Sequence, residues 1–235
     1  MAVDAKTKER TRALIEGLVK TFENADELYD EALCLAERGS VARALLLHQI
    51  SLEECGKADM LCVAVFSSLR GEDIDMKLLT RVFSRHEAKN KANAYFLAKS
   101  EVEARAHANS DSAAASEAFG KMQAQFHKDS NSLKNASLYV DFNGKFISPR
   151  EAVTAENLAD IRQRNADFMV MTHHKVSVIT TWGDDLDAAA DYYAQISSEL
   201  GFDRIKELDH KDLEARREFA EGVLKKVTEL AKINR

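Results

Sequence analysis

The chain has almost no residues that interrupt a helix. Its 235 residues include one proline, Pro149, and nine glycines. These are the residues that most disfavour a helix interior, whereas alanine, leucine, glutamate and lysine, which are plentiful here, favour it. A chain of this length with 45% hydrophobic residues can also bury a sizeable core. The sequence therefore predicts an all-α fold.

Apolar residues recur with helical spacing through most of the chain, and turn residues mark the ends of the helices. We expect a bundle of about six to seven helices. Residues 1–150 are predicted to form the main helical domain, and residues 151–235 to add helices that pack on the same domain. The predicted helices cover residues 4–38, 40–69, 75–108 with a break near His86, 112–133, 149–182, 184–200 and 209–235, with a break around Gly201.

One segment has a different character. Residues 138–147 read LYVDFNGKFI, in which Asn143 and Gly144 separate two short β-prone stretches. Asn-Gly between such stretches is the strongest short signal for a hairpin. The next residues, SPRE at 148–151, form a capping box with proline at the first helical position. We therefore expect one short β-hairpin near 138–147, followed at once by a helix.

The charge and the apolar segments exclude several classes of protein. A net charge of −6 argues against a protein that coats nucleic acid without specificity. The apolar runs are too short for a membrane span, and the charged N-terminal segment lacks the apolar stretch of a signal peptide. We therefore expect a cytoplasmic protein with no membrane partner.

The cysteine and histidine patterns give no sign of a metal or redox centre. Cys34, Cys55 and Cys62 lie in helical, mostly apolar contexts and are expected to be buried free thiols. The adjacent His173 and His174 point about 100° apart on a helix, which is a poor arrangement for chelation. The sequence therefore predicts neither a metal site nor a cofactor.

The second predicted helix carries charged residues in an apolar stripe. Glu54 and Lys57 fall on the same helical face as Leu47 and Leu61. Burying charges is costly unless they are paired and hydrogen-bonded. Glu53 points away from this face and is well placed for an i,i+4 pair with Lys57. Glu54 is thus either one half of a structural pair or a functional group, and both interpretations stay open.

A basic stretch follows in residues 77–105, which contain seven lysines and arginines but only three glutamates. It is the one segment with a surface suited to a polyanion, although a solvated helix face is the alternative interpretation. His86 and Lys89 lie on one side of a helix within it. We expect Glu54, Lys57, His86 and Lys89 to converge in one polar cluster between neighbouring helices.

Three short motifs occur in a defined order, EECGK at 53–57, HEAK at 86–89 and LYVD at 138–141, followed by Pro149. In a helix-rich chain, this order and spacing resemble the AbiV family of bacterial abortive-infection proteins. That family belongs to the HEPN superfamily of helical, often dimeric and frequently RNA-cleaving domains. The resemblance covers roughly residues 28–149. It implies an anti-phage protein that acts on RNA or on the translation machinery, forms a homodimer and answers to a phage-encoded protein trigger.

Active HEPN nucleases carry an Arg-x(4–6)-His motif. The arginine holds the phosphate, and the histidine acts as general base or acid on the 2′-hydroxyl without a metal. By position, Lys134, Asn135 and Tyr139 occupy the place of this motif here. Lysine keeps the positive charge but loses the bidentate geometry of arginine, and tyrosine is a poor general base at neutral pH.

The literal Arg-x(4)-His spacing occurs twice elsewhere, as Arg81 with His86 and as Arg43 with His48. Side chains five positions apart point about 140° apart on a regular helix, so their convergence needs a helix break or a second subunit. Arg81 and His86 are the better candidates because they lie in the basic stretch. His48 lies among leucines and is expected to be a core histidine.

Two functions stay open: a metal-independent HEPN ribonuclease, and a catalytically silent HEPN-like module that blocks translation or senses a phage protein by binding. A helical scaffold without a defence role is a third interpretation, which requires Glu54 and Lys57 to be a purely structural pair. The candidate catalytic residues are His86, Arg81, Lys89, Glu54 and Lys57. The candidate RNA-binding residues are Arg85, Lys134, Asn135 and Tyr139.

Overall fold

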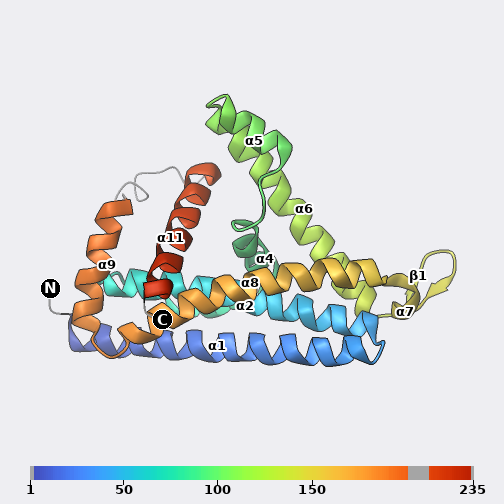
Figure 1. Ribbon diagram of the computed structural model, residues 1–235, viewed down its shortest axis with the longest axis horizontal. Helices are drawn as coiled ribbons and strands as arrows, with labels where there is room; N and C mark the ends of the chain where they lie inside the picture. The colour runs from blue at the N-terminus through green and yellow to red at the C-terminus, as the bar shows by residue number, and fades with distance from the viewer. Residues whose placement is uncertain (1–2, 201–211, 234–235) are drawn as a thin grey trace.

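The computed structural model describes residues 3–200 and 212–233, and these fold almost entirely into helices. The helices are α1 (Ala5–Glu37), α2 (Val41–Leu69), α3 (Met76–Phe83), α4 (His86–Ala94), α5 (Glu101–Ala108), α6 (Ser112–Leu138), α7 (Pro149–Ala152), α8 (Ala155–Trp182), α9 (Leu186–Leu200) and α11 (Leu213–Ile233). The long helices α1, α2 and α8 run side by side, and α6 rises obliquely from one end of them (Figure 1). The predicted all-α class is confirmed. The break predicted around Gly201 lies outside the described residues.

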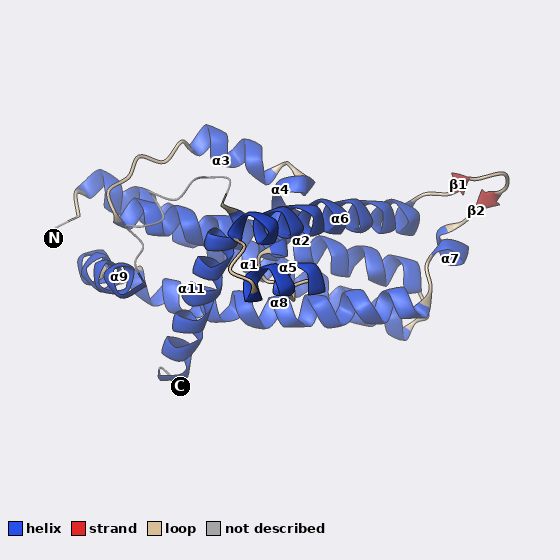
Figure 2. Ribbon diagram, turned by 90° about the horizontal axis from the view of Figure 1, so that it is seen from above, coloured by secondary structure: helices blue, strands red, loops and turns tan. Residues whose placement is uncertain are grey.

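The predicted hairpin is also confirmed. Strands β1 (Asp141–Phe142) and β2 (Phe146–Ile147) pair in antiparallel register, with Phe142 opposite Phe146. Gly144 in the turn has a φ of 73°, a left-handed conformation that glycine adopts without strain. The hairpin projects beyond the end of the long helices (Figure 2).

The described residues form ten helices, more than the six to seven predicted. Most of the difference arises in residues 75–108, which form α3, α4 and α5 because local caps start new helices. Asp75 caps α3 by accepting a hydrogen bond from a backbone amide, and Ser100 caps α5 in a capping box with Glu103. The one-turn helix α7 is likewise separate from α8.

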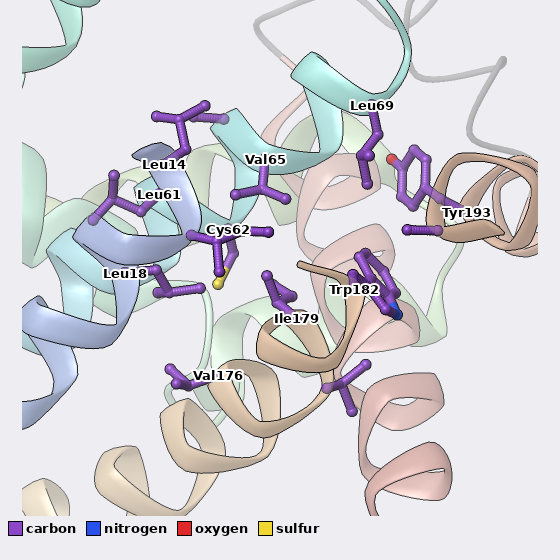
Figure 3. Close-up of a cluster of buried hydrophobic side chains, with 14 of the residues drawn as sticks. Leu14, Leu18, Leu61, Cys62, Val65, Leu69, Val176, Ile179, Trp182 and Tyr193 are labelled. Atoms are coloured by element: carbon purple, nitrogen blue, oxygen red, sulfur yellow. The ribbon is translucent and has the colours of Figure 1, made fainter. Parts of the chain in front are cut away.

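The core lies mainly between α1, α2, α8 and α9. Leu18, Val65 and Ile179 are fully buried where α1, α2 and α8 meet, and Trp182 and Tyr193 close one end of this cluster (Figure 3). A second apolar cluster joins α2 to α6 and α8 through Leu45, Leu52, Phe126, Ile161 and Phe168. Helix α2 is therefore covered on several sides, and its polar residues lie against other helices.

Two of the three cysteines follow the prediction. Cys55 and Cys62 are buried free thiols, and burial raises the pKa of each to about 12. Cys34 is exposed, which corrects the prediction, because it lies about 200° around α1 from the buried Ala32. Within the part of the chain that the structure describes, no helix is long and apolar enough to cross a membrane.

Candidate functional site

The candidate site is centred on Glu53 of α2, whose carboxylate meets three basic side chains. One carboxylate oxygen lies 2.5 Å from His86 Nδ1 and 3.0 Å from Lys89 Nζ, both on α4. The other oxygen accepts a hydrogen bond from Lys134 Nζ of α6 at 2.8 Å. We call Glu53, His86, Lys89 and Lys134 the Glu53 cluster. It lies where α2, α4 and α6 contact one another.

Gly56 sets the distance between α2 and α4. A Cβ on this residue would lie 2.6 Å from the carbonyl oxygen of Lys89 and 2.9 Å from Asn93 Oδ1, so the close approach requires glycine. Asn93 Nδ2 in turn donates to the carbonyl oxygen of Leu52 at 2.8 Å. Because Glu53 precedes Gly56 by three positions, both lie on the same side of α2. The close packing of α4 therefore brings Lys89 to the Glu53 carboxylate.

Glu53 is held in its ionised form. Its side chain is 3% exposed, and burial by itself favours the neutral acid. Hydrogen bonds from Lys134 and His86 and the charge of Lys89 outweigh burial, so the pKa of Glu53 is lowered. Two lysines around one carboxylate leave the cluster with a net positive charge even while His86 is neutral. The cluster is therefore electropositive and suited to a phosphate.

His86 is the member of the cluster that solvent reaches. Its side chain is 54% exposed, against 8% for Lys89 and 12% for Lys134. Because Nδ1 faces a carboxylate, it carries the proton of the neutral ring, and Nε2 keeps its lone pair. Nε2 can therefore accept a proton from a ligand while the carboxylate stabilises the imidazolium that forms.

Arg81 and Arg85 precede His86, and both are exposed. The helix break that the Arg81–His86 spacing requires is present, because α3 ends at Phe83 and α4 begins at His86, with Arg85 as its N-cap. Among the described residues, neither arginine forms a hydrogen bond or an ion pair with His86. Both guanidinium groups thus remain candidates for contacting a ligand from the solvent side.

Three residues at the C-terminal end of α6, Lys134, Asn135 and Tyr139, were predicted to occupy the place of the HEPN motif, and only the first lies in the cluster. Lys134 belongs to the Glu53 cluster. Asn135 and Tyr139 are exposed, Tyr139 at 62%. Arg43 Nη1 donates to the carbonyl oxygen of Ser137 at 3.1 Å and so fixes the end of α6 against α2.

Glu54 pairs with Lys57, as one interpretation of the sequence had it, whereas Glu53 has other partners than the sequence suggested. Lys57 Nζ lies 2.6 Å from Glu54 Oε2, so the predicted Glu53–Lys57 pair is wrong. The prediction that Glu54, Lys57, His86 and Lys89 form one cluster is therefore wrong: His86 and Lys89 converge on Glu53, whereas Glu54 and Lys57 form a separate pair. That pair is partly covered, with 10% of the Glu54 side chain and 24% of the Lys57 side chain exposed.

His48 is a core histidine, as the sequence predicted. Its side chain is fully buried, and its Nδ1 accepts a hydrogen bond from Asn165 Nδ2 at 3.2 Å. The ring also packs edge-on against Tyr29. Burial lowers the pKa of His48 to about 4, so the ring is neutral near pH 7. The Arg43–His48 spacing therefore marks no site.

His127 is a histidine beside the cluster that the sequence motifs did not reveal. Its Nδ1 lies 3.2 Å from Asn90 Nδ2, which links α6 to α4. His127 precedes Lys134 by two helical turns, so both lie on the same face of α6. This seven-residue spacing is the sequence feature that could have indicated that His127, like Lys134, lies where α6 contacts α4.

Comparison with known proteins assigns the chain to a family. A protein-family model described as AbiV, of the HEPN type, matches residues 13–169. The matched range contains every residue of the Glu53 cluster. A relative from Sinorhizobium fredii, named uncharacterized protein y4gJ, is 46% identical over 101 residues, which cover 43% of this chain and 53% of the relative. The chain thus spans about half the length of that relative. No solved structure matches the chain.

Proposed function

Because the chain belongs to the AbiV family of HEPN proteins, we propose that it is an abortive-infection protein that stops phage production by acting on RNA. The Glu53 cluster is the proposed active site, and His86 is the proposed proton-transfer group. The observation that carries this proposal is a buried carboxylate that holds a half-exposed histidine beside two largely buried lysines.

The proposed reaction is metal-independent cleavage of an RNA strand. His86 Nε2 takes the proton of a ribose 2′-hydroxyl, and the 2′-oxygen forms a bond to the adjacent phosphorus. The bond from phosphorus to the 5′-oxygen breaks, and that oxygen takes up a proton, which leaves a 2′,3′-cyclic phosphate and a 5′-hydroxyl. Lys89, Lys134 and the exposed Arg85 offset the negative charge on phosphate, and Glu53 stabilises the imidazolium.

The proposed active form is a homodimer. One copy of the cluster supplies one solvent-accessible histidine, whereas cleavage needs a base for the 2′-hydroxyl and an acid for the leaving oxygen. Two copies that face one RNA strand supply both groups. A phage-encoded protein is the proposed trigger, because a constantly active ribonuclease would also harm its host.

Binding without catalysis is the second candidate function. Lys134 and Tyr139, which stand where active HEPN motifs have arginine and histidine, favour it. In this case, the same electropositive cluster holds RNA or a component of the translation machinery, and His86 supplies a contact but transfers no proton.

Induced expression in a bacterial host, with and without phage infection, followed by gel analysis of total RNA, tests the proposal. The wild-type protein should arrest growth or phage production and fragment RNA, and His86→Ala should abolish both effects. His173→Ala removes an exposed histidine of α8 and is the matched control, which should behave as the wild type. Arrest with intact RNA by both the wild type and His86→Ala would leave binding as the function.

A further inference from the structure

Three metal-binding side chains meet where α5 contacts α11. His107 Nε2 lies 2.9 Å from Glu218 Oε1 and 3.8 Å from Glu214 Oε1. Their potential ligand atoms all lie within 4.8 Å of one another, and among the described residues this is the one such group of three. Glu214 and Glu218 are four positions apart on α11, so both carboxylates point from one face of that helix toward His107.

Neighbouring polar contacts hold this face of α11 in place. Arg217, between the two glutamates in sequence, forms a buried ion pair with Glu103 of α5. The guanidinium also lies over the Phe119 ring, 4.8 Å from its centroid. The Glu214 backbone amide donates to Ser116 Oγ of α6 at 3.2 Å. The three ligand side chains are therefore held near one another before any ion binds.

Glu214 gives independent evidence for a cation at this position. Its side chain is 5% exposed, and its Oε2 is buried with no hydrogen-bond partner among the described residues. A buried carboxylate oxygen without a partner destabilises the fold. Glu214 Oε1 has Lys99 Nζ at 3.0 Å. The ion pairs here join Glu103, Glu214, Glu218 and Glu221 to Lys99, Arg217 and His107, so four negative charges face two positive ones and the net charge is −2 while His107 is neutral.

We propose that His107, Glu214 and Glu218 bind a divalent transition-metal ion of the zinc class. Imidazole nitrogen and carboxylate oxygen are ligands that zinc accepts, and three protein ligands leave one position for water. On binding, Lys99, whose side chain is 24% exposed, releases Glu214 and turns toward solvent. The ion links α11, which lies beyond the family-matched residues, to α5. The ion would hold α11 against α5, and this role is separate from the RNA chemistry proposed for the Glu53 cluster.

The alternative is an ion pair of protonated His107 with the two carboxylates, with no metal. Isothermal titration of the chelator-stripped full chain with ZnCl₂ distinguishes the two. The titrations use a Cys34→Ser background, because the exposed Cys34 thiol is itself a zinc ligand. We expect saturable 1:1 binding that weakens at least tenfold in His107→Ala and in Glu218→Gln, together with an upward zinc-induced shift in Tm that both variants lose.

His173→Ala is the matched control, because His173 and His174 are two adjacent histidines away from the proposed site, with ring centroids 6.3 Å apart. Its zinc titration should equal that of the background protein. No 1:1 binding by the background protein, or binding that His173→Ala removes and His107→Ala retains, would overturn the proposal. The readouts are affinity and Tm, so the result does not depend on whether the chain cleaves RNA.

Discussion

The Glu53 carboxylate and the His86 imidazole lie 2.5 Å apart, yet the Glu53 side chain is 3% exposed and the His86 side chain 54%. A buried acid thus orients a base that solvent reaches. Lys89 and Lys134 lose most of their hydration around the same carboxylate, which costs stability unless every charge is paired. The ligand-binding role proposed for the cluster accounts for an arrangement with this cost.

Glu53→Gln should destabilise the fold by about 3–5 kcal/mol, because it leaves Lys89 and Lys134 buried without a counter-charge. Urea unfolding monitored by circular dichroism measures the change. The matched control is Glu87→Gln on α4, which breaks an exposed i,i+4 pair with Lys91 and should leave stability essentially unchanged. Equal unfolding midpoints for the two variants would show that the cluster does not contribute to stability.

Gly56→Ala should destabilise the fold by about 1–3 kcal/mol, because the new methyl group meets the Lys89 carbonyl oxygen at 2.6 Å and pushes α4 away from α2. Lys89 and His86 should then lose contact with Glu53, so RNA cleavage should fall as well. Gly17→Ala is the control, since its Cβ would meet no atom closer than 3.9 Å. The Gly17→Ala substitution should stabilise α1 by about 0.5–1 kcal/mol. If Gly17→Ala and Gly56→Ala destabilised the fold equally, the close approach of α4 at Gly56 would not be the cause of the loss.

Glu53 and Gly56 also show which features the sequence predicts and which it does not. Scarce proline and glycine predicted the helices, and Asn143 with Gly144 predicted the hairpin, because both signals are local. Glu53 was assigned to a surface pair because helical spacing followed the Leu47 face. Its true partners lie on helices whose placement depends on packing across the whole chain. The signal that was available was Gly56, since a glycine within a helix marks a side where another backbone approaches.

Packing also brings His107 near Glu214 and Glu218. The helix predicted over 75–108 breaks into three, which turns His107 on α5 toward α11. Glu214 and Glu218 are far from His107 in sequence, so no spacing rule relates them. Residues that meet in space can therefore be predicted from sequence only where one helix carries them, as with His86 and Lys89.

Stability should fall in acid over two pH ranges that overlap only near pH 4 to 4.5. Burial lowers the pKa of His48 from 6.5 to about 4. As the pH falls, His48 therefore becomes protonated in the unfolded chain before it does in the folded chain. Its contribution is complete above about pH 6.5 and is lost as the pH falls toward 4. The pKa of Glu53 is lowered from 4.5, so its contribution is complete above about pH 4.5 and is lost as the pH falls through the folded-state value.

Urea unfolding at a series of pH values between 8 and 3 separates the two contributions. His48→Leu should flatten the dependence between about pH 6.5 and 4, and Glu53→Gln should flatten it below about pH 4.5. The exposed His173 provides the control, because His173→Ala should leave both ranges unchanged. A His48→Leu profile that keeps the full upper slope would assign that slope to other groups.

His86 and the end of α6 are the two positions from which a base could act. Tyr139 stands where the HEPN motif has histidine, is 62% exposed and lies outside the contacts of the Glu53 cluster. If His86 is the base, a histidine at position 139 lacks the contact with the Glu53 carboxylate that orients His86, so Tyr139→His should not restore RNA cleavage to the His86→Ala variant. Lys134→Arg should keep the ion pair with Glu53 and retain cleavage, since the guanidinium still carries the positive charge and can bind the carboxylate through two parallel N–H groups. Cleavage assays on the purified single and double variants, each checked for a wild-type unfolding midpoint, measure both effects. Restored cleavage in the His86→Ala, Tyr139→His double variant would move the catalytic histidine to the end of α6 and reduce His86 to a binding contact.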